Sequence, residues 1–195
     1  MRVSLDPTGE LCNLIVNHPD VFPLLSEDDN PIDLRPLAQN PRARLLVGVP
    51  PLGTYVAARI LDGVWEFHAG VLPEGRGAWN VEFSEAAIRY MFVETDAIEL
   101  ITRVPVTHLA CLTLVKKFGF MPRWRGRDTV RWKGRETGYQ VWSLTAMDWL
   151  PFDDLQRRET YGDMMRAGNE AKARNWIIRE QILAREGQRE PPVSD

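Results

Sequence analysis

The stretch that decides the fold is VWEFHAGVLPEGRGAW, residues Val64 to Trp79. It predicts a strand, then a loop of proline, glycine and arginine, and then the start of a helix. The first N–H groups of a helix have no partner within it and carry the positive end of its dipole, so they can bind phosphate. Gly75 and Gly77 permit a sharp turn, and Arg76 adds a positive charge. The loop is therefore either a phosphate site or a purely structural turn.

The surrounding sequence alternates strands with helices. Val81, Ala87, Ile88, Met91 and Phe92 recur near helical spacing, which predicts an amphipathic helix over 79–94. The expected strands are residues 44–49, 53–61, 64–71 and 99–104, followed by two strands around the Lys133-Gly134 turn. Asp62-Gly63 is a two-residue hairpin signal. This order predicts an α/β domain with a mixed, mostly antiparallel central sheet and helices on both faces.

The order of these motifs resembles the GNAT superfamily of acyl-CoA-dependent N-acetyltransferases over roughly residues 43–150. Val71, Pro73 and Arg76 fall on the family's V-x-P and Q/R-x-x-G-x-G/A loop. Downstream, VPVTHLACLTLVKKFGF resembles the family's second helix and its K-x-G-F ending, with Lys117, Gly119 and Phe120 in place. The pattern resembles most the members found in bacteriophage and prophage genomes. The resemblance implies acetyl-CoA as acyl donor and an amine as acceptor.

The resemblance also implies the cofactor contacts. They are Val71, Leu72, Arg76, Gly77, Ala78, Trp79, His108 and Lys117. Three departures stand out: Trp79 and Val81 replace the loop's two family glycines, Val115 replaces a tyrosine that protonates the departing thiolate, and His108 replaces an asparagine. The loop keeps its N–H donors whatever its side chains, so it can still bind phosphate if the Trp79 ring points away from it.

Two candidate catalytic residues share one face of the strand 64–71. Side chains alternate along a strand, so Glu66, His68 and Gly70 point together. An imidazole that titrates near neutrality is a suitable base for an ammonium acceptor. His68 is therefore either the general base or a histidine bonded to a neighbouring strand, with Glu66 beside it. Gly70, near the strand's end, suggests a bulge or a close approach of backbone.

A basic segment, RWRGRDTVRWKGR at residues 123–135, holds six basic residues, one acid and two tryptophans. Such a mixture can bind nucleic acid through phosphates and stacking. In a strand pair, however, Arg123 and Arg125 alternate with Trp124, which predicts an amphipathic hairpin with a solvated basic face. The net charge of −3 favours the hairpin interpretation over nucleic-acid binding.

Composition adds a few limits. The 195 residues suit one globular domain with an appendage. No apolar run is long enough to span a membrane and no secretory signal precedes the first motif, so we expect a cytoplasmic protein. Cys12 and Cys111 match no metal spacing and no disulfide framework, and Cys111 is expected to be buried.

We expect residues 1–150 to form the GNAT-like domain, with residues 1–40 wrapping it as loops and short helices. The resemblance implies that this N-terminal segment lies on the acceptor side. Residues 151–195 predict a helical extension with one apolar stripe, which either packs on its own domain or forms a homo-oligomer. The resemblance thus implies an N-acetyltransferase for an unidentified small-molecule or protein amine. The alternative is a catalytically inactive GNAT-derived interaction module, favoured by Trp79, Val81 and Val115.

Overall fold

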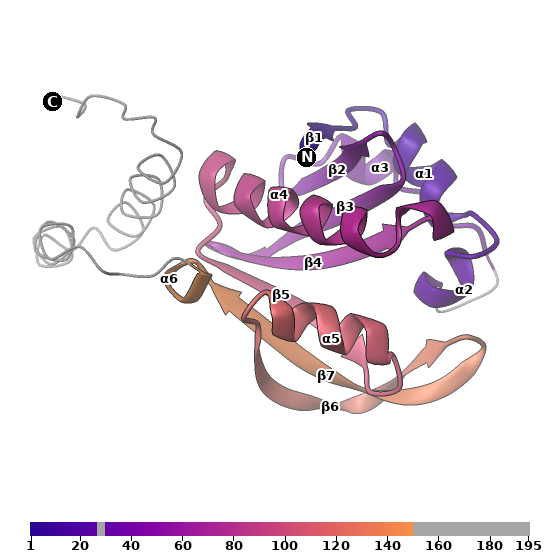
Figure 1. Cartoon of the computed structure of the whole chain (residues 1–195), viewed down its shortest axis with the longest axis vertical. Coiled ribbons are helices and arrows are strands. Elements are labelled where there is room, and N and C mark those ends of the chain that lie inside the picture. Colours follow the sequence, from indigo (N-terminus) through magenta and orange to yellow (C-terminus); the bar gives the residue numbers. More distant parts are fainter. Residues whose placement is uncertain (27–29, 150–195) are drawn as a thin grey trace, which may run out of the picture.

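The computed structural model describes residues 1–26 and 30–149. They form a seven-stranded sheet in the order β1-β2-β3-β4-β5-β7-β6 (Figure 1). All neighbouring strands are antiparallel except β4 and β5, so the predicted mixed, mostly antiparallel sheet is confirmed. The strands are β1 (Arg2–Leu5), β2 (Ala43–Val49), β3 (Gly53–Leu61), β4 (Val64–Val71), β5 (Glu99–Pro105), β6 (Met121–Trp132) and β7 (Arg135–Thr145).

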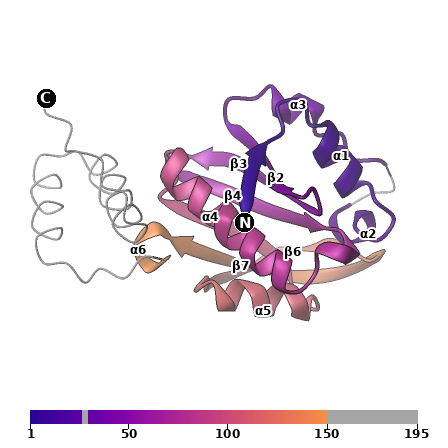
Figure 2. The same ribbon diagram turned by 45° about the horizontal axis from the view of Figure 1, so that its top comes forward.

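Helices cover both faces of the sheet, as predicted. The long helix α4 (Ala78–Glu94) and α5 (Leu109–Lys117) lie on one face, and α1 (Glu10–Val16) and α3 (Arg35–Ala38) on the other (Figures 1 and 2). The short helices α2 (Phe22–Leu25) and α6 (Ala146–Trp149) and the 3₁₀ turn η1 (Pro73–Gly75) complete the set. No helix within the described ranges is long and apolar enough to cross a membrane.

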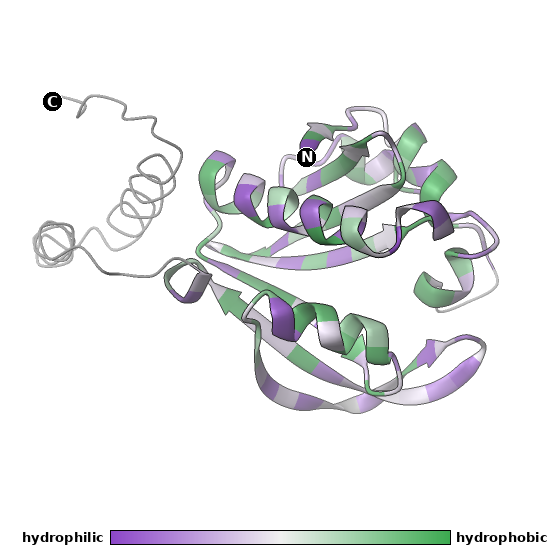
Figure 3. Cartoon of the chain, viewed as in Figure 1, coloured by the Kyte–Doolittle hydropathy of each residue, from purple (hydrophilic) through white to green (hydrophobic). Residues whose placement is uncertain are grey.

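The larger core lies between the sheet and the helices α4 and α5, and apolar and polar residues alternate along both helices (Figure 3). Its fully buried members include Leu46, Trp65, Phe83, Phe92, Leu100 and Leu144. A smaller core under α1 and α3 contains Cys12, Ile15, Val16, Leu34, Leu45 and Val47. The sheet therefore lies between two layers of helices, with α4 and α5 on one face and the N-terminal helices α1 and α3 on the other.

The two predicted hairpin turns are confirmed. Leu61 pairs with Val64 around Asp62-Gly63, and Trp132 pairs with Arg135 around Lys133-Gly134. Lys133 and Gly134 both have positive φ, 51° and 71°, as a two-residue hairpin turn of the mirror-image type requires.

The N-terminal segment departs from the expectation of loops and short helices, because residues 2–5 form the edge strand β1. It pairs with β2 from Arg2 opposite Val49 to Leu5 opposite Leu46. Four residues are too few for a periodic pattern to show in the sequence, so only pairing with β2 reveals this strand. The short helices that follow agree with the prediction.

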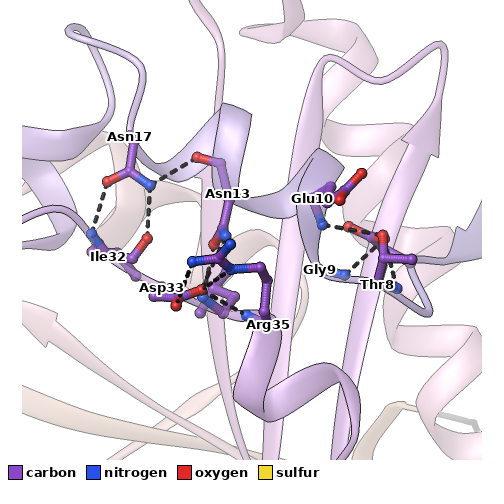
Figure 4. A network of polar contacts seen from close by, with 10 residues as sticks. Thr8, Gly9, Glu10, Asn13, Asn17, Ile32, Asp33 and Arg35 are labelled. Atoms are coloured by element: carbon purple, nitrogen blue, oxygen red, sulfur yellow. Dashed lines mark hydrogen bonds and ion pairs between the residues drawn. The ribbon is translucent and has the colours of Figure 1, made fainter.

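Asparagine side chains hold the N-terminal segment together. Asn17 forms two bonds with the backbone of Ile32, donating to its carbonyl at 2.7 Å and accepting from its N–H at 2.8 Å (Figure 4). Asn13 donates to Asp33, which also binds Arg35 through two side-chain bonds of 2.9 Å (Figure 4). These bonds tie α1 to the entrance of α3, so the segment covers the second face of the sheet as one unit.

Gly70 forms no bulge, contrary to one of the two expectations. It pairs in register with Thr54, and the irregularity of this strand pair lies between Arg59 and Leu61. A Cβ at position 70 would lie 3.1 Å from Leu25 Cδ1 and 3.2 Å from Val21 Cγ1. The glycine therefore permits close packing of side chains from α2 and the residue before it.

Candidate active site at the split between β4 and β5

The sheet opens between its two parallel strands. Only three register pairs join them, from Val64 opposite Glu99 to Glu66 opposite Ile101. Beyond Glu66, residues 67–71 of β4 pair with β3 alone, and β5 continues to pair with β7. Alternate backbone groups of this part of β4 consequently point into the opening without a ladder partner. We call this opening the split.

The N-terminus of α4 follows directly from the end of β4. Its first helical bond joins the N–H of Val81 to the carbonyl of Gly77. Among the described residues, no hydrogen bond uses the N–H groups of Gly77, Ala78, Trp79 and Asn80, and no side chain caps the helix. A Cβ at Gly77 would meet nothing within 4 Å, so there is open space beside these donors. A phosphate fits this arrangement.

The Trp79 side chain points away from those donors. Its ring packs against the sheet and lies 4.9 Å from the Phe83 ring, centroid to centroid. A Cβ at Gly48 would approach Trp79 Cζ2 to 2.6 Å, and one at Gly53 would approach Cζ3 to 3.0 Å. Two glycines of β2 and β3 thus make room for an indole that would otherwise stand in the loop. The tryptophan at a position where the GNAT pattern has glycine therefore leaves the space beside these amides open.

Arg76 is exposed at the same loop and donates to the carbonyl of Asp20 at 3.0 Å. The tip of the β6–β7 hairpin also reaches the N-terminal segment, where the Lys133 N–H donates to Pro23 O at 2.9 Å. These two contacts place the positive charges of Arg76 and Lys133 at the end of the split beside the α4 N-terminus, which we call the mouth of the split. An anionic ligand bound at the α4 N-terminus would experience both.

His108 is the N-cap residue of α5. Its Nδ1 accepts from the Cys111 N–H at 3.1 Å, and its ring meets Trp132 edge-on at 5.1 Å. Burial lowers the pKa of His108, and the nearby charges of Lys133 and Arg76 lower it further. His108 is thus a helix cap beside the same basic mouth.

The other predicted cofactor contacts are distributed along the split. Val71 ends β4, and the Leu72 N–H already donates to Leu52 O at 2.9 Å, so the Leu72 amide is not an open donor. Lys117 is exposed at the far end of α5 from His108, roughly 14 Å away at the rise of an α-helix. The structure therefore brings Arg76 and His108 together and leaves Lys117 apart from them.

Glu66 and His68 lie together on the face of β4 opposite α4, as the alternation predicted. His68 Nε2 is 3.3 Å from Glu66 Oε1, and the Arg103 Nε donates to the same oxygen at 2.5 Å. The hydrogen bond from His68 and that from Arg103 lower the pKa of Glu66 to about 2, although burial opposes this. The His68 side chain is 41% exposed and the Glu66 side chain 15%. Glu66 is therefore ionised at neutral pH, and His68 can meet a ligand.

Two further positions on α5 bear on the chemistry. Val115, where the resemblance places a tyrosine, is buried in the larger core and offers no proton donor to the split. Cys111 packs beside that core, and burial raises its thiol pKa to about 11, so it is not a ready nucleophile. In the described ranges, no cluster of histidine, cysteine and acidic residues could hold a metal ion.

The basic segment does not form the simple amphipathic hairpin expected. Its strand β6 lies at the edge of the sheet, with register irregularities from Pro122 to Arg125 and from there to Thr129. Trp124 is 59% exposed instead of packed, because the irregular pairing breaks the alternation of faces. Trp132 alone of the two tryptophans contacts the mouth of the split.

Sequence reasoning missed Arg103, the partner of Glu66. Nothing local marks it, because it comes from β5 and lies 37 residues from Glu66 in the chain. Its place near Glu66 follows from the register of β4 with β5, which the sequence pattern does not give.

Comparison with protein-family models and with curated proteins finds no match. Among solved structures, a spermidine N-acetyltransferase from Vibrio cholerae, in complex with CoA and spermine, matches with a TM-score of 0.64 and 14% identity. The match covers 76% of this chain and 96% of that chain. A ribosomal-protein-S5-alanine acetyltransferase from Vibrio fischeri matches with a TM-score of 0.59 and 14% identity, over 76% of this chain and 94% of that chain.

A putative acetyltransferase from Acinetobacter baylyi matches with a TM-score of 0.58 and 16% identity, over 74% of this chain and 92% of that chain. At such identities the likeness concerns the fold. The chain has the fold of the GNAT acetyltransferases.

Proposed function

We propose that this protein is an N-acyltransferase of GNAT type that transfers an acetyl group from acetyl-CoA to an amine. The observation that carries the proposal is the split, with four open amides at the start of α4 and the exposed imidazole of His68 on β4, the strand that leads into that helix. The acceptor is an unidentified amine of a small molecule or a protein. Cytoplasmic location, a phage-type origin and self-association through residues 151–195 stay predictions from the sequence, and those residues lie outside the described ranges.

The donor side of the site uses backbone groups and one arginine. The N–H groups of Gly77, Ala78 and Trp79 would hold the pyrophosphate, with Arg76 adding charge from the same loop. His108 at the α5 cap and the hairpin tip stand on the other side of this mouth. Acetyl-CoA supplies the activated acyl group, and the unpaired N–H groups of β4 are the donors available to polarise its carbonyl.

The acceptor side uses His68 as the general base. Its imidazole takes the proton from the incoming amine, because its side chain is exposed and a neutral imidazole nitrogen offers a lone pair to the proton. Glu66 is too weak a base for it, because its pKa lies near 2. Val115 provides no proton for the departing thiolate, so we assign that proton to water.

A thermal-shift titration with acetyl-CoA tests the donor site. A ligand that binds only the folded state stabilises it by about 2.7 kcal/mol at a hundred times Kd, which raises Tm by roughly 5–10 °C for a chain of this size. Arg76→Glu should reduce this shift while leaving the Tm of the free protein nearly unchanged, because Arg76 makes one exposed bond. Arg42→Glu, at an exposed arginine directly before β2, is the matched control and should bind as wild type does.

The absence of any shift at millimolar acetyl-CoA would favour the second candidate, an inactive interaction module. Buried Val115 and the exposed Trp124 on the basic edge strand are the observations in its favour. A protein of this kind would bind its partner through the edge of the sheet and would not need the split.

A further inference from the structure

Arg103 reaches across the split from its far side. If the pairing of β4 and β5 continued beyond Glu66 and Ile101, Arg103 would lie opposite His68. The strands separate at this point, and the guanidinium turns back to Glu66, where its Nε lies 2.5 Å from Oε1. The guanidinium carbon also lies over the ring of Tyr139, on β7, 6.0 Å from the ring centroid. Arg103 thus joins the two halves of the sheet where they diverge.

Glu66 stands between a permanent cation and an imidazole. The same oxygen, Oε1, receives Arg103 Nε and lies 3.3 Å from His68 Nε2. A carboxylate with only 15% exposure stays charged when it has such partners, and the guanidinium supplies a charge that does not titrate. The position of the carboxylate therefore depends on Arg103, and the orientation of the imidazole depends on the carboxylate.

This chain of contacts distinguishes the two nitrogens of His68. A carboxylate on the Nε2 side favours the neutral imidazole that carries its proton on Nε2, which leaves the lone pair on Nδ1. We infer that Arg103 is a positioning residue that acts through Glu66 to hold His68 with Nε2–H toward the carboxylate and Nδ1 toward the acceptor amine. The inference rests on the proposed function, in which His68 is the base. In that step Nδ1 takes the amine proton, and the resulting imidazolium is stabilised by the Glu66 carboxylate.

The first test reads the imidazole directly, without any substrate. In the ¹⁵N-labelled full chain, the His68 signals are identified by their loss in His68→Ala. Neutral His68 should show a protonated Nε2 and an unprotonated Nδ1 in the wild type. Glu66→Gln and Arg103→Gln should both shift this pattern toward a mixture of the two forms, and Arg103→Lys should shift it less. Arg42→Gln is the control and should leave the pattern unchanged.

The second test follows CoA release from acetyl-CoA, with the small primary amine glycinamide as acceptor probe. Glu66→Gln and Arg103→Gln should each lower kcat by about tenfold, with the KM for acetyl-CoA unchanged, because they misplace the base without touching the donor site. The double variant should be no slower than either single variant, since both act through one chain of contacts. Arg103→Lys should recover part of the rate.

Losses in kcat that add in the double variant, or an imidazole pattern unchanged in Arg103→Gln, would overturn the inference. A rise in the KM for acetyl-CoA with kcat unchanged would also overturn it, since that result marks a role in binding. If the wild type binds no acetyl-CoA, the proposed function fails. The nitrogen pattern of His68 still decides separately whether Arg103 positions the imidazole.

Discussion

Replacing Gly48 by alanine tests where the Trp79 ring lies, on which the phosphate site depends. A Cβ at position 48 would lie 2.6 Å from Trp79 Cζ2 and 2.7 Å from Cη2, with Phe83 Cδ2 at 3.0 Å. Overpacking of this kind costs about 1–3 kcal/mol, and the reduced freedom of the unfolded chain returns about 0.4–1 kcal/mol. We expect Gly48→Ala to lower the free energy of unfolding by about 1–2 kcal/mol, which is a fall in Tm of roughly 3–8 °C.

A double-mutant cycle, measured by urea unfolding, tests whether the loss of stability comes from the contact between the new Cβ and the Trp79 ring. Trp79→Leu removes Cζ2 and Cη2 and leaves only the Phe83 contact, so in that background Gly48→Ala should cost clearly less and the coupling energy should reach about 1 kcal/mol. Gly138→Ala in β7 is the matched control, because a Cβ there would meet nothing within 4 Å. It should be neutral or slightly stabilising.

The acetyl-CoA titration completes this test. Trp79→Leu should leave the affinity for acetyl-CoA unchanged, because the ring points away from the open amides. A neutral Gly48→Ala together with tighter binding by Trp79→Leu would place the indole in the phosphate loop, and our reading of the site would then be incorrect.

Three other predictions concern pH, helix capping and the C-terminal residues. The pKa of Glu66 is lowered from 4.5 to about 2 by its bonds to His68 and Arg103, so its contribution to stability is complete above about pH 5 and is lost as the pH falls through 2. With partly exposed partners we expect about 1–2 kcal/mol, seen as a difference in urea unfolding between wild type and Glu66→Gln at pH 7 that falls to about a quarter of this value at pH 2.5. Asp6→Ala should destabilise the fold by about 1–3 kcal/mol in thermal unfolding, because the buried carboxylate accepts from the N–H groups of Gly9 and Cys12 at the start of α1. Asp6→Asn should retain part of that stability. Equal stability of the wild type and both variants would contradict this role of Asp6 in capping the helix. A chain ending at Leu150 should keep acetyl-CoA binding and scatter light as a smaller particle than the lost mass explains, whereas a full-length monomer at tens of micromolar would exclude self-association through residues 151–195.

The sequence alone predicted the elements that local patterns encode. Alternation along residues 64–71 placed Glu66 and His68 on one face, and the proline and glycine residues after Val71 marked the turn into α4. The two-residue turns and the order of strands and helices were likewise readable, because period, turn chemistry and helix start signals act over a few residues.

What only the tertiary structure decided arises from contacts between residues far apart in the chain. The edge strand β1 exists through its pairing with β2, and the Trp79 ring is directed by the two glycines of β2 and β3 that make room for it. Arg103 contacts Glu66, which is 37 residues away in the chain, because β4 and β5 stop pairing two residues before Arg103. Such contacts depend on how whole strands are placed in the sheet, and local periodicity carries no information about that placement. These contacts determine which of the predicted residues can act together.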